Sequence, residues 1–121
     1  MRLANNEYPC PCCGHMSFSE PPGSYDICPI CYWEDDVVQL RWVLRGGGAN
    51  KPSLVESQQN YAKHGAMEER FVKNVRQPRA GDERDPEWRP VDTERDRPQE
   101  RDDQPWGKDY TVYYYWRSPA T

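Results

Sequence analysis

The sequence predicts a small α+β protein organised around cysteine-rich loops rather than around a large apolar core. Two Cys-x2-Cys pairs lie within residues 7–33, a helix pattern with a capping signal follows residue 52, and an aromatic, β-branched run covers residues 110–116. Hydrophobic residues make up 36% of the 121 positions, below the roughly 45–50% of ordinary globular domains. We therefore expect that burial of apolar surface alone does not order the whole chain.

The strongest signal is the spacing of four cysteines, Cys10, Cys13, Cys28 and Cys31. The two residues between the members of each pair let both thiolates of a tight turn reach one ion, and a hairpin can bring the two turns together. Four sulfurs in this arrangement are typical of a closed, tetrahedral structural zinc site. We therefore expect a zinc-ribbon-like module with four cysteine ligands that binds one Zn²⁺, whose binding free energy adds to the stability of the fold.

Other uses of these cysteines remain open at this level. The same four sulfurs can hold iron, as rubredoxin-type turns do, or form two disulfides, although no secretory signal supports an oxidising compartment. Redox chemistry at Cys-Pro-x-Cys needs a βαβ context. The remaining cysteine, Cys12, is expected to pack beside the site as a passive thiol, with a redox or second-metal role as the alternative. A closed site has no open position for a substrate, so we expect no metal-dependent hydrolysis. Because the sequence offers no nucleophile–base pair, we also expect that the protein is not an enzyme.

The cysteine turns are expected to be joined by a short β-hairpin. Residues 17–19 and 25–27 are typical of two short strands, and the Pro-Pro-Gly-Ser sequence at residues 21–24 is a turn signal between them. Residues 37–44 are apolar and too short to assign by periodicity, so we expect a strand or a short helix there.

One main helix and a C-terminal strand complete the predicted fold. The helix begins after Ser53, which forms a capping box with Glu56, and ends at Gly65, a residue suited to the left-handed conformation that closes helices. Residues 110–116 consist of aromatic and β-branched side chains and are predicted to form a C-terminal β-strand.

The charge divides the chain into unlike parts. The formal net charge is −4, yet residues 82–105 hold ten acids and five bases, or −5, together with four prolines. Such a composition does not fold alone. We therefore predict a cysteine and helix module at residues 1–80, an acidic Pro-rich linker or extended arm at residues 81–106, and the aromatic strand at residues 107–121.

The sequence also predicts where the protein is found. The first residues contain no apolar signal region, and no apolar run approaches the roughly 20 residues that a membrane span needs. We therefore expect a cytoplasmic protein that does not enter a membrane and keeps its thiols reduced.

Acidic and aromatic residues suggest a protein partner. Tyrosine and tryptophan are frequent in protein interfaces, and an acidic arm favours a basic partner surface. A nucleic-acid partner is less expected because the overall balance is acidic, and the oligomeric state stays open. The residues predicted to contact a partner are Trp33, Glu34, Asp35, Asp36, Trp88, Tyr113 and Tyr115. The alternative for the acidic run 34–36 is a solvated edge, and for the tyrosines it is core packing.

The cysteine turns also carry a family resemblance. The runs Tyr8-Pro9-Cys10-Pro11-Cys12-Cys13-Gly14 and Tyr25-Asp26-Ile27-Cys28-Pro29-Ile30-Cys31-Tyr32-Trp33-Glu34-Asp35-Asp36 resemble the bacterial CPCC-type cysteine-rich family, and the likeness extends over roughly residues 8–80. The resemblance implies a small zinc-ribbon-like module followed by a helix, without a catalytic motif. It also implies that some members are immunity proteins encoded near a toxin system.

Together these features predict a function in binding rather than in catalysis. We expect a non-enzymatic zinc-binding protein that acts through protein–protein interaction, most concretely an immunity-type protein that neutralises a bacterial toxin. The alternative is a zinc-ribbon protein that binds nucleic acid or assists transcription.

Overall fold

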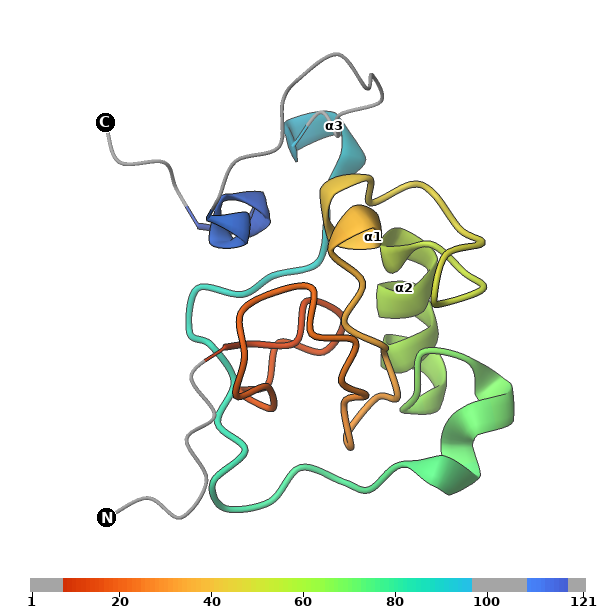
Figure 1. Ribbon diagram of the computed structural model, residues 1–121. Helices are drawn as coiled ribbons and strands as arrows, with labels where there is room; N and C mark the ends of the chain where they lie inside the picture. The colour runs from red at the N-terminus through yellow and green to blue at the C-terminus, as the bar shows by residue number, and fades with distance from the viewer. Residues whose placement is uncertain (1–7, 97–108, 118–121) are drawn as a thin grey trace.

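The computed structural model describes residues 8–96 and 109–117. The elements, in chain order, are α1 (Val37–Arg41), α2 (Leu54–His64), the 3₁₀ helix η1 (Glu69–Asn74), α3 (Thr93–Asp96) and the 3₁₀ helix η2 (Tyr110–Tyr113). The cysteine-bearing loops, red to orange in Figure 1, lie between α2 on one side and the teal segment of residues 76–92 on the other. No helix of the described residues is long and apolar enough to cross a membrane.

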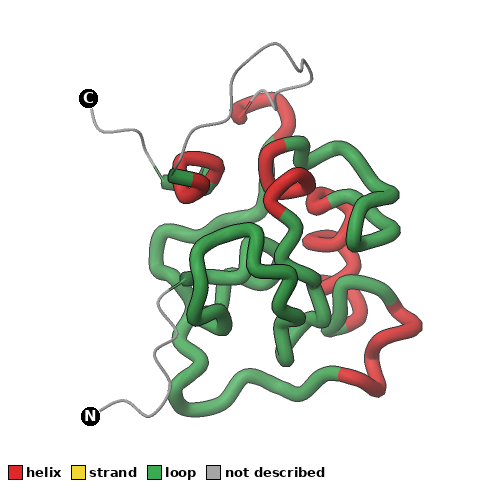
Figure 2. Tube along the Cα trace, viewed as in Figure 1, coloured by secondary structure: helices red, strands yellow, loops and turns green. Residues whose placement is uncertain are grey.

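The predicted hairpin between the cysteine turns does not form. Within the described ranges the backbone is helix or loop, with isolated bridges in place of strands (Figure 2). Phe18 pairs with Tyr8, and Ile27 pairs with Glu34, so residues 17–19 and 25–27 do not pair with each other. The reason is local, because the residues that flank each cysteine turn pair with each other across that turn. Tyr8 and Phe18 flank the first turn, and Ile27 and Glu34 flank the second.

The predicted C-terminal strand is also wrong. Residues Tyr110–Tyr113 form η2, whose first turn is capped by the Asp109 carboxylate accepting from the Thr111 N–H. A strand needs a neighbouring strand for its backbone groups, and the described residues contain none beside it. Tyr114 and Trp116 follow η2 and are buried, which agrees with core packing as the role of this aromatic run.

The main helix forms as its local signals predict. The Ser53 hydroxyl accepts from the Glu56 N–H, and the Glu56 carboxylate accepts from the Ser53 N–H, which completes the capping box. Gly65 follows α2 with φ +87°, the left-handed conformation expected at this position. The uncertain run 37–44 resolves into the short helix α1, capped by Asp36.

A buried amide pair holds the loop between α1 and α2. The Asn50 side chain donates to the Glu34 carbonyl and accepts from the Glu34 N–H, each at 2.9 Å. This one amide therefore makes the two backbone hydrogen bonds that a neighbouring strand would make. Gln39 in α1 bonds both the side chain and the N–H of Asn50. Both amides are nearly inaccessible to solvent, and their bonds keep the second cysteine turn against the helices.

The first part of the predicted acidic arm lies against the cysteine loops. We call residues 82–92 the strap; its backbone pairs with the first cysteine turn through the bridge between His15 and Arg84. Among the described residues, four of the arm's acids pair with arginines: Asp82 with Arg76, Asp96 with Arg89, and both Asp85 and Glu87 with Arg117. Residues 1–7, 97–108 and 118–121, which include the rest of the arm, lie outside the described residues.

Candidate metal centre

The four predicted ligand cysteines meet at one point of the structure. Their sulfur atoms all lie within 4.8 Å of one another, with 3.5 Å between Cys10 and Cys31 and 3.8 Å between Cys13 and Cys28. A tetrahedral zinc with bonds of about 2.3 Å separates its sulfurs by about 3.8 Å. All four cysteines are free thiols and fully buried. The donor set and its spacing therefore fit a tetrahedral metal ion.

The two turns that carry the sulfurs have the same backbone design. In the first turn, residues 10–15, the Gly14 N–H donates to the Cys10 carbonyl at 2.7 Å; in the second, residues 28–33, the Tyr32 N–H donates to the Cys28 carbonyl at 2.8 Å. Both of these donors have positive φ, +83° and +75°. Each turn thereby closes on itself, and its two sulfurs lie close to those of the other turn.

The repeat of the turn explains Cys12. It occupies in the first turn the place that Ile30 occupies in the second, directly before the second ligand, and both side chains are buried. Burial raises the pKa of the Cys12 thiol. Because the equivalent residue of the second turn is an isoleucine, the neutral Cys12 thiol acts as a small apolar side chain.

Burial and hydrogen bonds between the sulfurs act differently on the individual thiols. Burial raises the pKa of Cys10 and of Cys31 well above the ordinary value. Burial acts the same way on Cys28, but hydrogen bonds from the other three sulfurs and from Ser17, whose hydroxyl lies 3.1 Å from its sulfur, hold the pKa of Cys28 well below the ordinary value. The cluster thus favours the ionised form of Cys28 over that of Cys10 or Cys31. A bound divalent ion would supply the positive charge that buried thiols need to lose their protons.

Three residues predicted to face a partner are instead interior. Trp33, Asp35 and Asp36 are 0%, 2% and 5% exposed, which corrects the expectation of an acidic, solvated edge here. Asp35 accepts from the N–H and the hydroxyl of Ser24, and burial nevertheless raises the pKa of Asp35. Asp36 caps α1 and accepts from the Ala49 N–H. These carboxylates serve as hydrogen-bond acceptors for the loops beside the second turn.

The other predicted partner residues are half-buried. The backbone N–H and carbonyl of Glu34 bond the Asn50 side chain, and the residue as a whole is half-buried. Tyr113 lies beside the Arg41 guanidinium, 5.4 Å from the ring centre. Trp88 donates its indole N–H to the Pro11 carbonyl in the first cysteine turn. Of the predicted partner residues, these and Tyr115 keep some access to solvent.

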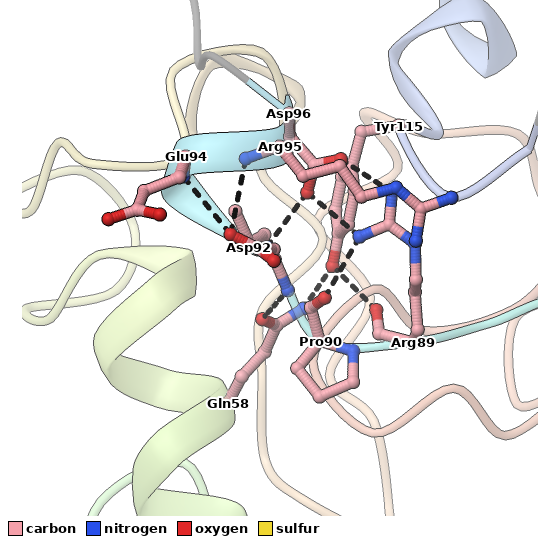
Figure 3. A network of polar contacts seen from close by, with 9 residues as sticks. Gln58, Arg89, Pro90, Asp92, Glu94, Arg95, Asp96 and Tyr115 are labelled. Carbon is pink, nitrogen blue, oxygen red and sulfur yellow. Dashed lines mark hydrogen bonds and ion pairs between the residues drawn. The ribbon is translucent and has the colours of Figure 1, made fainter.

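Gln58 joins the metal module to the rest of the chain and was not predicted as a site residue. Its amide donates to the Pro11 carbonyl and to the Tyr115 hydroxyl, and its oxygen accepts from the Val91 N–H. Tyr115 in turn donates to the Arg89 carbonyl (Figure 3). The signal was present in the sequence, since a glutamine on the inward face of α2 needs partners when buried.

Asp85 completes the attachment of the C-terminal residues. Its carboxylate accepts from the Trp116 indole at 3.0 Å and from the Arg117 guanidinium at 3.1 Å. Burial acts to raise the pKa of Asp85, but these bonds and one from the Glu87 N–H outweigh it and hold the pKa below the ordinary value. No local pattern predicts these contacts, because they join residues about thirty positions apart.

Comparison with known proteins supports the cysteine module. A family described as Cysteine-rich CPCC matches residues 8–82, which include both turns, α2 and the start of the strap. No curated protein matches the chain.

Proposed function

We propose that this chain, which belongs to the cysteine-rich CPCC family, is a non-enzymatic zinc-binding protein that acts by binding another protein. The most concrete form of this proposal is an immunity-type protein that neutralises a toxin, the role that the family resemblance implies. The observation that carries the proposal is the closed set of four buried sulfurs.

Zinc is the ion that this donor set suits best. Four thiolates in a tetrahedron, buried and without a neighbouring carboxylate or histidine ligand among the described residues, are typical of structural zinc. Iron takes the same ligands, so the metal content decides between the two. A site of this kind contributes roughly 10–16 kcal/mol in small zinc-dependent peptides, which meets the need that the low hydrophobic content creates.

The two histidines of the chain support a role without catalysis. His15 lies with Nδ1 2.6 Å from the Asp82 carbonyl oxygen, and His64 ends α2 with Nε2 4.0 Å from the Glu69 carboxylate. Among the residues that the structure describes, neither imidazole ring hydrogen-bonds a serine or cysteine that it could activate as a nucleophile. A closed metal site likewise offers no place for a substrate.

Apolar side chains at the surface support a protein partner. Tyr25 and Ile27 are 54% and 46% exposed on the loop between the two cysteine turns, where they add nothing to the core. The other large apolar residues exposed are Val38, Leu44, Val72 and Val112. Acidic side chains that stay exposed on and beside the strap, among them Glu83, Glu87 and Glu94, favour a basic partner.

The proposal is tested by metal content and by binding to the product of a neighbouring gene. Elemental analysis of the purified chain is expected to find one zinc. Binding to a toxin encoded beside it is expected to be tight, with an association rate that falls as salt is added. Zinc without such binding refutes the immunity-type role, while a shift of DNA or RNA in a gel at low salt supports the nucleic-acid alternative.

A further inference from the structure

The strap satisfies the backbone of the first cysteine turn. The Asp85 N–H donates to the Gly14 carbonyl at 2.8 Å, and the Met16 N–H donates to the Glu83 carbonyl at 2.7 Å. These bonds flank the bridge between His15 and Arg84. The turn that carries Cys10 and Cys13 is therefore held along its open edge by residues that follow it by about seventy positions.

Two side chains of the strap reach further into the same turn. The Trp88 indole N–H donates to the Pro11 carbonyl at 2.9 Å, and the Arg84 Nε donates to the Cys13 carbonyl at 2.9 Å. The Arg84 guanidinium also stacks over the Trp88 ring, 4.8 Å from its centre. The ring lies so close to Gly14 that a Cβ there would stand 2.6 Å from it. The carbonyls at positions 11, 13 and 14 thus all accept from the strap.

The second cysteine turn is held differently. The Arg76 N–H donates to the Pro29 carbonyl at 3.1 Å, and the Met67 N–H donates to the Cys31 carbonyl at 2.7 Å. No side chain of the strap bonds the second turn in the described residues, and Pro29 is exposed. The two halves of the metal centre are alike in backbone but differ in how they are covered.

We infer that the strap is a latch on the metal centre, in which Trp88 and Arg84 are positioning residues that hold the first turn closed and slow the loss of metal. For an ion to pass to a competing ligand, the cysteines must leave it in turn, and a cysteine leaves when its turn opens. Hydrogen bonds to the groups around metal ligands typically change metal affinity by about 10–100-fold. The inference rests on the proposed metal binding.

The test measures how fast zinc leaves the intact protein. Zinc-loaded full-length protein is mixed with excess EDTA and rapidly desalted after successive times. The zinc that remains bound to the protein at each time gives the release rate. Trp88→Ala is expected to release zinc about tenfold faster than wild type, and Arg84→Ala severalfold faster. Because Arg84 is exposed, its variant is expected to fold even where Trp88→Ala does not.

Matched controls separate the latch from general destabilisation. Trp42→Ala removes a tryptophan that is 3% exposed and stacks with Arg41 and Arg45 instead of a cysteine turn. Arg79→Ala removes an exposed arginine whose bond to the strap uses its backbone N–H. Neither control is expected to change the release rate measurably.

The outcomes separate the latch from the metal site. Equal rates for Arg84→Ala and Arg79→Ala, with one zinc per chain in both, overturn the latch and leave the metal site standing. Equal acceleration by Trp88→Ala and Trp42→Ala shows release through global unfolding and overturns the latch as well. A wild type that holds no metal overturns the proposed function itself.

Discussion

Replacing Gly14 by alanine tests the packing of the strap on the first cysteine turn. An ideal Cβ at Gly14 would stand 2.6–2.9 Å from three atoms of the Trp88 ring, and the residue has φ +83°. The ring must move, and its hydrogen bond to Pro11, worth about 0.5–1.5 kcal/mol net, is lost with it. The positive φ adds about 1–2 kcal/mol. We expect Gly14→Ala to lower the free energy of unfolding by about 2–3 kcal/mol.

The two costs can be separated by a second substitution. In a Trp88→Ala background the clash is gone, so Gly14→Ala is expected to cost only the backbone part, about 1–2 kcal/mol. The difference is a coupling energy of about 1 kcal/mol, of the size seen for residues in contact. Gly65→Ala is the matched control, because Gly65 has φ +87° and nothing lies within 4 Å of its added Cβ. Its cost is expected to be the same in both backgrounds.

Guanidinium unfolding of zinc-loaded protein, at one fixed zinc concentration, measures all of these variants. The equivalent residue of the second turn shows what to expect from the backbone alone. Tyr32 carries a side chain at φ +75° and packs its ring on Phe71, so the turn accepts a side chain where space exists. A cost of Gly14→Ala that is unchanged by Trp88→Ala refutes the placement of the strap on the first turn.

The remaining predictions concern the ligands, the Gln58 junction and acid stability. Cys28→Ser is expected to abolish stoichiometric zinc and the fold, whereas Cys12→Ala keeps one zinc in elemental analysis; loss of zinc from both contradicts a packing role for Cys12. Gln58→Leu is expected to lower the free energy of unfolding in guanidinium by about 1–3 kcal/mol, because it leaves the Val91 N–H without its partner and removes one of the two bonds at the Pro11 carbonyl. Gln59→Leu, at the exposed neighbouring position, is expected to change it by less than about 0.5 kcal/mol, and equal costs refute the junction. The pKa of Asp85 is lowered by its partners, so its contribution is fully present above the unfolded pKa of about 3.9 and is lost as pH falls through the lower folded pKa. The stability difference between wild type and Asp85→Asn is therefore expected to shrink only at acid pH, and a pH-independent difference contradicts this reasoning.

The parts of the fold that the sequence predicted are those whose partners lie within a few residues. The capping box of Ser53 and Glu56 and the closing glycine Gly65 act over three or four positions, and α2 forms between them. The same holds for the cysteine turns, where a spacing of two residues places both sulfurs of a pair on one side of a tight turn. The sequence also pointed to one shared site, and the four sulfurs do converge.

The predictions that failed depended on partners farther along the chain. A run of aromatic and β-branched residues forms a strand only where another strand pairs with it, and in the described residues η2 forms instead, with the Asp109 carboxylate at its start. Asp35 and Asp36 look like surface residues until their acceptor roles toward Ser24 and Ala49 are known. Charge and periodicity do not contain this information, because a carboxylate is buried when donors converge on it.

By itself the sequence determined the cysteine turns, the main helix and the family, since each is set by residue types at short fixed spacings. The tertiary structure alone decided what the acidic arm does. Its composition predicts a segment that cannot fold independently, and in the structure residues 82–92 lie along the first cysteine turn and donate to its carbonyls. Asp82 and Asp96 pair with arginines only six and seven positions away. Asp85 pairs with Arg117, 32 positions further along the chain, and only the tertiary structure brings those two charges within hydrogen-bonding distance.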